Sequence, residues 1–210
     1  MIFFYAPKAC SFASHLALEH VGAKYEAHRL DFSKNQQRED EYLNMNPKGR
    51  VPALLTDQGL ITENIAILAF IAQSYPEAKL APIDDPFQFA RVQAFNSYLS
   101  STVHVAHAHN YRGYRWVNAD DTHSIEAMQA KVPSTMTECF QIIEDTMIEG
   151  PWVMGANYTI CDMYLFTICQ WLEGDGVDIN LFPKVANHFQ LMNEDSVVQR
   201  VKAKENLGSE

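Results

Sequence analysis

The sequence predicts an α/β unit over residues 1–79 followed by an all-helical unit over residues 87–210. Up to residue 79, short apolar segments alternate with segments of helical periodicity. Residues 80–86 contain two prolines and two aspartates, a composition typical of a linker. Beyond the linker, apolar residues recur at helical spacing to the end. A chain of 210 residues is long enough for two such units, each with its own core.

The first unit opens with a strand, a helix and a second strand. Residues 2–5 are apolar and aromatic, as in a buried strand. Residues 11–21 have helical spacing, and Gly22 follows as a stop signal. Residues 25–32 alternate loosely, which predicts the second strand.

A hairpin and a helix complete the first unit. Residues 51–56 and 60–62 read as its two strands, joined by a turn that contains Gly59. Residues 63–75 have the spacing of a helix, which Pro76 ends.

The second unit is predicted to consist of helices alone. Residues 87–116 form one long candidate, and residues 124–149 form a second, with Pro133 as an irregularity. Residues 159–173 form a third, and residues 184–204 hold two shorter helices.

One helix start carries a specific signal. Thr159 is followed three residues later by Asp162, the spacing of a capping box. We therefore expect Thr159 to cap this helix and the Asp162 carboxylate to reach back to the cap.

The charge distribution limits the partners. Sixteen Lys and Arg against twenty-six Asp and Glu give a net charge of −10. Residues 1–78 hold 7 basic and 9 acidic residues, which leaves 9 and 17 for the remainder. A protein so acidic is not expected to bind nucleic acid, which needs a basic face. Because no apolar run reaches about 18 residues, no membrane association is expected either.

Four cysteines are too few and too scattered for a disulfide framework: Cys10, Cys139, Cys161 and Cys169. No pair has the C-x-x-C spacing of a zinc or dithiol site. The first ten residues lack the pattern of a signal peptide. We therefore expect a cytoplasmic protein.

Several motifs, in order along the chain, resemble those of the cytosolic glutathione transferases, and Cys10 with His104 resembles the bacterial beta class. This resemblance implies a thioredoxin-like domain followed by a helical domain, usually in a homodimer. It also implies glutathione as the co-substrate. The motifs are YAPKACS at 5–11, NPKGRVPAL at 46–54, TENIAI at 62–67, LSSTVH at 99–104, GANYTICD at 155–162 and VDI at 177–179.

Cys10 is the predicted catalytic residue. It lies between the first strand and the first helix, where the helix dipole and unpaired N–H groups favour a thiolate. Ala13 stands where a dithiol enzyme has its second cysteine, so only monothiol chemistry remains. Two hydroxyl groups are alternatives for contact with the glutathione thiol, those of Tyr5 and Ser11, although Ser11 suits a helix N-cap by type.

The resemblance assigns further residues to glutathione. The Val51–Pro52 bond is expected to be cis, so that the Val51 backbone pairs with the cysteinyl part of glutathione. Glu63 and Asn64 open a helix and would receive the γ-glutamyl end, with Asn64 as the N-cap. Lys34 would pair with a carboxylate of glutathione, or lie in a solvated loop.

His104 is predicted to line the active site and to exchange a proton with a thiol. The sequence departs from the family at three places: Asn64 replaces a common serine, Ser97 a common asparagine, and Val105 a common lysine. Each departure concerns glutathione or the active site, so the affinity for glutathione is open.

The helical unit is expected to provide a pocket for the electrophile. His107, Tyr111 and Tyr114 are candidates to line it, although a dimer or helix-packing surface would have the same composition. No metal is expected, because His104, His107 and His109 lack an acidic or cysteine partner in sequence.

Two functions follow from these residues. The first is glutathione transfer to hydrophobic electrophiles, or glutathione-dependent reduction of disulfides and peroxides. The second is a non-catalytic, partner-binding protein with the same fold, because fold does not determine function.

Overall fold

A computed structural model of the chain describes residues 1–206. These residues form two compact units. The first comprises Met1–Ala90 together with the chain from Met192 onward, and the second comprises Arg91–Leu191. The predicted domain limits at residues 79 and 87 stay a prediction.

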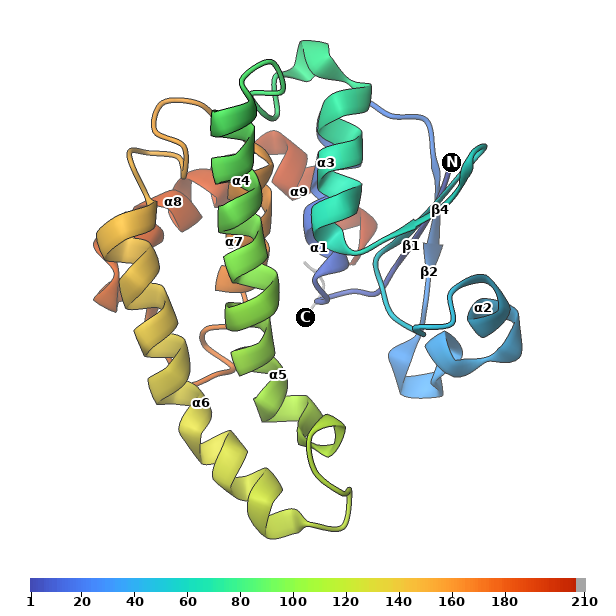
Figure 1. Cartoon of the computed structure of the whole chain (residues 1–210), viewed down its shortest axis with the longest axis vertical. Helices are drawn as coiled ribbons and strands as arrows, with labels where there is room; N and C mark the ends of the chain where they lie inside the picture. The colour runs from blue at the N-terminus through green and yellow to red at the C-terminus, as the bar shows by residue number, and fades with distance from the viewer. Residues whose placement is uncertain (207–210) are drawn as a thin grey trace. The chain divides into compact units, whose positions relative to one another are not determined.

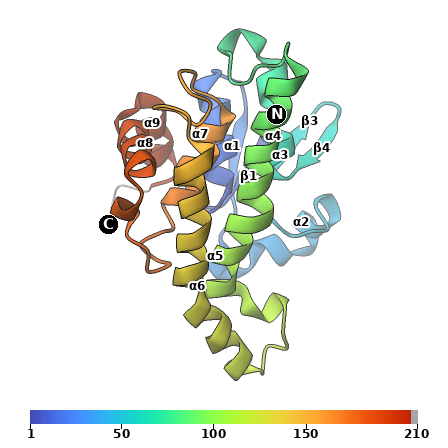
Figure 2. The ribbon, with the colours of Figure 1, turned by 60° about the vertical axis from the view of Figure 1, so that its left-hand side comes forward.

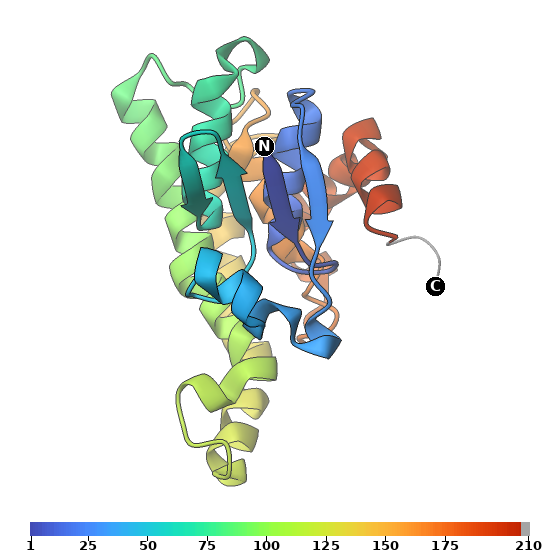
Figure 3. The ribbon, with the colours of Figure 1, turned by 90° about the vertical axis from the view of Figure 1, so that its right-hand side faces the viewer.

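A four-stranded sheet forms the centre of the first unit, in the order β2-β1-β3-β4. Strand β1 runs parallel to β2, with Ile2 opposite Glu26, whereas β1–β3 and β3–β4 are antiparallel. Figure 3 shows the four strands side by side. Their bounds are Ile2–Tyr5 for β1, Glu26–Arg29 for β2, Ala53–Thr56 for β3 and Gly59–Thr62 for β4.

Helices cover both faces of this sheet. Helices α1 (Ser11–His20) and α3 (Asn64–Ser74) lie together on one face, and α2 (Asp40–Met45) lies on the other (Figures 1 and 3). Helix α9 (Ser196–Lys204) returns to pack against α1. The core between α1, α3 and the sheet is fully buried and includes Phe3, Phe12, Leu16, Leu54, Ile67, Leu68 and Ile71.

The predicted order of strands and helices in this unit is confirmed, with two corrections. Strand β2 is shorter than the predicted 25–32, because Asp31 accepts a hydrogen bond from the Ser33 backbone and starts a 3-10 turn at Phe32–Lys34. A second turn at Gln36–Arg38 and helix α2 were not predicted, since their apolar residues are few and fit no long period.

The second unit is helical, as predicted. Figure 2 shows α5 and α6 side by side. The elements from residue 86 to residue 194 are α4 (Pro86–Tyr98), the π-helix η4 (Leu99–Val103), α5 (His104–Arg112), the 3-10 turn η5 (Gly113–Arg115), α6 (Thr122–Ile142), the π-helix η6 (Ile143–Met147), α7 (Ile160–Cys169), the 3-10 turn η7 (Ile179–Leu181) and α8 (Pro183–Glu194).

The prediction of a single helix over residues 87–116 was wrong in detail. A π-helix interrupts it at Leu99–Val103, and within it the hydroxyls of Ser100 and Ser101 both donate to the carbonyl of Ser97. Serine bonds of this kind compete with the regular helical ladder. Pro133, in contrast, lies inside a continuous α6.

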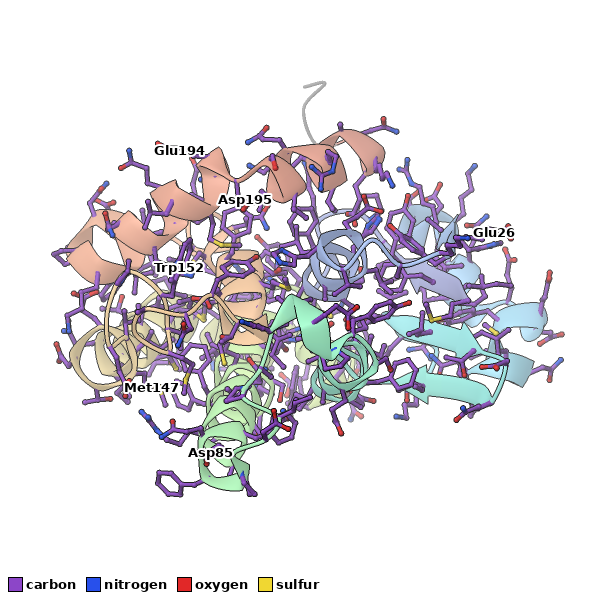
Figure 4. All side chains as sticks on the ribbon, turned by 90° about the horizontal axis from the view of Figure 1, so that it is seen from above. Glu26, Asp85, Met147, Trp152, Glu194 and Asp195 are labelled. Carbon is purple, nitrogen blue, oxygen red and sulfur yellow. The ribbon has the colours of Figure 1, made fainter. Side chains whose placement is uncertain are left out.

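Aspartates start several of these helices. Asp85 accepts hydrogen bonds from the backbone of Phe87 and Gln88, and Asp195 does the same for the first turn of α9 (Figure 4). The predicted capping box of Thr159 and Asp162 is confirmed at the start of α7. Within residues 1–206, no helix combines the length and the apolar character needed to cross a bilayer.

Candidate active site

Cys10 is the N-cap residue of α1, directly after the loop that follows β1. Its side chain is partly exposed, and its thiol donates a hydrogen bond to the Val51 carbonyl at 3.4 Å. The first N–H groups of a helix have no partner within the helix, and together with the dipole they stabilise an anion. The thiol therefore lies beside these N–H groups, and its catalytic role stays a prediction.

The loop that carries Val51 is held by buried polar contacts. The predicted cis bond between Val51 and Pro52 is confirmed. The Arg50 carbonyl accepts hydrogen bonds from the Tyr42 hydroxyl at 2.6 Å and from the side-chain amide of Asn46 at 2.8 Å. The side chains of Tyr42 and Asn46 are both buried, so packing holds these two donors in place. They fix the backbone that meets the Cys10 thiol.

Glu63 precedes α3 in a strained backbone conformation with φ at 74°. This left-handed region is uncommon for residues other than glycine. The Glu63 carboxylate forms an ion pair with the Lys48 ammonium at 2.6 Å, and Lys48 also donates to the Thr62 hydroxyl at 2.8 Å. The glutamate predicted to meet an ammonium group therefore already has a cationic partner from the same unit.

Asn64 does not act as the predicted N-cap. It is the first residue of α3, and its side chain turns inward toward α1. The Asn64 amide donates to the Cys10 carbonyl at 2.6 Å, and its oxygen accepts from the Ser14 hydroxyl at 2.6 Å. Because its amide is engaged on both sides, Asn64 can offer a ligand only its backbone N–H, along with the helix start behind it.

The two hydroxyl alternatives to Cys10 are also occupied or buried. The Ser11 hydroxyl accepts from the Ala6 N–H and donates to the Ala6 carbonyl, both at 3.2 Å, so the prediction of Ser11 as N-cap was wrong. Tyr5 is 6% exposed and its ring packs beside Phe3 and His15. Burial, followed by the charge of Glu205, raises the pKa of Tyr5, which opposes ionisation of this phenol.

Lys34 lies at the end of the 3-10 turn after β2. Its ammonium is 3.7 Å from the Asp31 carboxylate, and its side chain is 74% exposed. The Lys34 ammonium is thus accessible to a ligand. The same exposure also fits the alternative prediction, that Lys34 is a solvated loop residue.

His104 opens α5 immediately after the π-helix at Leu99–Val103. Its ring lies 4.9 Å from the ring of Trp171 and 6.4 Å from that of His107. The sequence predicted that His104 and His107 share one face of the helix, and the structure confirms this.

His107 pairs with a carboxylate that sequence inspection did not find. Its Nδ1 lies 2.7 Å from Oδ2 of Asp175, and its ring stacks on Trp171 at 4.2 Å. Asp175 follows His107 by 68 positions, so nothing local connects them. Among the other pocket candidates, the Tyr111 hydroxyl is 3.3 Å from the Gly174 carbonyl, and Tyr114 lies 52% exposed in the 3-10 turn after α5.

The three remaining cysteines are buried: Cys139, Cys161 and Cys169. Burial raises the pKa of each of these thiols, which makes them poor nucleophiles. Among residues 1–206, no group of three or more His, Cys, Asp or Glu side chains is arranged to hold a metal ion.

Comparison with known proteins places the chain among related sequences. The family model described as "Glutathione S-transferase, N-terminal domain" matches residues 1–73. Glutathione S-transferase GstA of Escherichia coli O157:H7 is 31% identical to the chain, over 99% of this chain and 100% of that protein.

Solved structures agree over almost the whole chain. A glutathione transferase homologue from Sulfitobacter, solved with bound glutathione, has a TM-score of 0.92 and 40% identity, covering 97% of each chain. A bacterial beta class glutathione S-transferase from Sphingomonas chungbukensis has a TM-score of 0.85 and 28% identity, covering 99% of this chain and 100% of that one. The predicted thioredoxin-like domain followed by a helical domain is thereby confirmed, and the chain belongs to the glutathione S-transferase family.

Proposed function

We propose that this transferase binds glutathione in its first unit and uses Cys10 as the reacting or thiol-contacting residue. The observation that supports this most is the contrast among its cysteines. Cys10 is partly exposed at a helix start, whereas the other three are buried with raised pKa values. A reactive cysteine needs both access and a thiolate-stabilising environment, and Cys10 is the one of the four with both.

The glutathione contacts that we propose follow the backbone around Cys10. The Val51 N–H and carbonyl would pair with the cysteinyl part, and the carbonyl already accepts a thiol at 3.4 Å. The γ-glutamyl carboxylate would meet the first N–H groups of α3, beginning with that of Asn64. Its ammonium would meet Glu63, with Lys48 displaced or shared. Lys34 would take the remaining carboxylate.

The same site supports two reactions. In conjugation, the thiolate of glutathione forms a C–S bond to an electrophile and the leaving group departs. In reduction, the Cys10 thiolate attacks the glutathionyl sulfur of a mixed disulfide, forming a new disulfide with Cys10 and releasing a thiolate. The thiolate of a second glutathione then attacks the glutathionyl sulfur of that disulfide. This step releases the Cys10 thiolate and forms oxidised glutathione. Because Ala13 stands in place of a second cysteine, glutathione must supply this second sulfur.

The assembly and location that we expect are those implied for the family, a homodimer in the cytoplasm. The exposed aromatic side chains of Tyr111, Tyr114 and Trp116 suit either a dimer surface or a substrate pocket. Sedimentation of the purified chain at several concentrations would distinguish a dimer from a monomer.

The experiment that tests the proposed function has two stages. Retention on immobilised glutathione and calorimetric titration measure binding. Incubation with oxidised glutathione, followed by intact-mass measurement, then shows whether one glutathionyl group attaches. We expect binding and a single adduct, which is lost in Cys10→Ala and kept in the matched variant Cys139→Ala, because Cys139 is only 5% exposed.

Turnover then separates the two reactions. An aryl chloride with glutathione measures conjugation, and a dialkyl disulfide with glutathione measures reduction. If the protein neither binds glutathione nor forms an adduct, the enzyme proposal is contradicted and the non-catalytic alternative is favoured.

A further inference from the structure

An ion pair that is open to solvent stands at the start of α3, within the first unit. The Lys48 ammonium lies 2.6 Å from Oε1 of Glu63 and donates to the Thr62 hydroxyl at 2.8 Å. The side chains of Lys48 and Glu63 are 50% and 62% exposed. Exposed ion pairs contribute little to stability, so stability alone does not account for an array in which both members are held by the backbone around them.

The turn that carries Lys48 is held on two sides. The Asn46 side-chain oxygen accepts from the Lys48 backbone N–H at 3.3 Å, and the Asn46 carbonyl accepts from the Gly49 N–H at 2.9 Å. Gly49 has φ at 56°, and a Cβ there would come within 2.8 Å of both Nη1 of Arg38 and the Gln37 carbonyl oxygen. Only glycine fits this turn without a shift of its neighbours, so the base of the Lys48 side chain is fixed.

Glu63 is held by the helix that follows it. It is the N-cap residue of α3, and its carbonyl accepts from the Ile67 N–H at 3.0 Å. Its positive φ is strained for a residue other than glycine, and strained residues cluster where a protein binds or clamps a ligand. Glu63 therefore stands directly before the first N–H groups of α3, which favour an anion.

Both members of the pair can accept a further partner without releasing each other. A lysine ammonium has three donors, and the bonds to Glu63 and Thr62 use two of them. A carboxylate has about four acceptor sites, so Glu63 can accept from a second ammonium beside Lys48. The pair has no net charge, so a ligand with one positive and one negative group suits it better than a simple ion does.

Asn64 makes the third donor of Lys48 important. The side-chain amide of Asn64 donates to the Cys10 carbonyl, and its oxygen accepts from the Ser14 hydroxyl. Asn64 therefore offers no side-chain donor to a carboxylate at the start of α3. Lys48 is the cation that the structure brings next to this helix start, through its bond to Glu63.

We propose that Lys48 binds the α-carboxylate of the γ-glutamyl end of glutathione, while it stays paired with Glu63. This inference rests on the proposed function and adds a residue that determines specificity. The α-ammonium and α-carboxylate of this end are carried by the same carbon, so both can face one ion pair. The site then selects ligands that carry both charges, and it discriminates against analogues that lack either one.

The test measures one charge of the ligand against one charge of the protein. Isothermal titration calorimetry gives Kd for S-methylglutathione, which has no free thiol, and for its analogue with a 4-aminobutanoyl group in place of γ-glutamyl, which lacks the α-carboxylate. Lys48→Met should weaken S-methylglutathione by about 3–10-fold, because a partly exposed, charged hydrogen bond is lost. The analogue should bind the variant as well as or better than the wild type, because Glu63 no longer shares its charge with Lys48.

A second variant tests the other half of the pair. Glu63→Gln should likewise weaken S-methylglutathione, and it should not weaken the analogue with a glutaryl group, which lacks the α-ammonium. Lys24→Met is the matched control, because it removes one positive charge from an exposed residue between α1 and β2. Lys24→Met should leave each Kd within about twofold of the wild type. Urea unfolding of each variant shows that the folded protein is compared throughout.

The outcomes separate this inference from the proposed function. If Lys48→Met weakens S-methylglutathione and the 4-aminobutanoyl analogue by the same factor, Lys48 only shapes the loop and the inference is overturned. It is also overturned if Lys48→Met strengthens S-methylglutathione, because Lys48 would then only compete with the ligand ammonium. In both cases the wild type still binds glutathione and the proposed function stands. A wild type that binds neither glutathione nor S-methylglutathione would refute the proposed function itself.

Discussion

Asn64 is the residue whose replacement most directly tests how α1 and α3 are joined at the Cys10 site. In Asn64→Ala two buried hydrogen bonds are lost, those to the Cys10 carbonyl and from the Ser14 hydroxyl, each 2.6 Å long. The Cys10 carbonyl keeps a partner in the Ala13 N–H at 3.3 Å. Ser14 is fully buried, so its hydroxyl is left to find a weaker partner within its own helix.

The magnitude follows from these two partners. One lost hydrogen bond costs about 1 kcal/mol, and a buried hydroxyl without its acceptor costs about 1–3 kcal/mol more. We therefore expect Asn64→Ala to lower the free energy of unfolding by about 2–4 kcal/mol. A double-mutant cycle with Ser14→Ala should show a coupling of about 0.5–3 kcal/mol, because the two side chains are in direct contact.

The assay must report on the first unit. All three tryptophans, Trp116, Trp152 and Trp171, belong to the second unit, so their fluorescence would miss a loss confined to the first. Urea unfolding followed by far-UV circular dichroism, together with the alkylation rate of Cys10 in the native protein, covers both units. Asn44→Ala is the matched control: Asn44 is exposed in α2, and its loss should change stability by less than about 0.5 kcal/mol. A loss below about 1 kcal/mol in Asn64→Ala would refute the role assigned to the two bonds.

Two further predictions concern buried carboxylates. Burial raises the pKa of Glu205 above its ordinary 4.5, against the opposing effects of its hydrogen bond and charge interaction with His15. As the pH rises, the unfolded chain therefore loses the Glu205 proton at a lower pH than the folded chain does. The stabilisation from the protonated Glu205 carboxyl is fully present below pH 4.5 and is lost as the pH rises through the raised pKa, by at most about 1.4 kcal/mol per pH unit. In urea titrations from pH 4 upward, the stability of the wild type relative to Glu205→Gln should fall, and a rise would contradict this reasoning. Asp162→Ala removes the acceptor of the Val153 and Thr159 N–H groups and the partner of His188, so it should cost about 3–5 kcal/mol in urea unfolding at pH 7. A loss under about 1 kcal/mol would show that water replaces the carboxylate.

Features that depend on neighbouring residues were predictable from the sequence. The capping box at Thr159 and Asp162 is one, because both of its bonds lie within a single helical turn. The hairpin around Gly59 is another, since its turn conformation, with φ at 133°, suits glycine. Periodicity likewise predicted α3, whose buried residues Ile67, Leu68, Ile71 and Ala72 recur at helical spacing.

Local rules failed where a polar side chain found its partner outside its own helix. Asn64 and Ser11 both have the residue type of an N-cap, and in both the side chain bonds elsewhere: to α1 for Asn64, and to Ala6 for Ser11. A cap contributes only about 1 kcal/mol, so competing buried hydrogen bonds can replace it. The π-helix at Leu99–Val103 was missed for a similar reason, because a helical period does not reveal one inserted residue.

The amino-acid order alone was sufficient to identify the family and the two classes of structure, because these depend on contiguous motifs and on the period of apolar residues. The pairing of His107 with Asp175, and of Asn64 with Cys10 and Ser14, required the folded chain. These partners are 50 to 68 positions apart, and no local pattern marks them. A buried polar group must find its hydrogen bond wherever folding brings a donor or acceptor within about 3 Å, and that encounter is a property of packing.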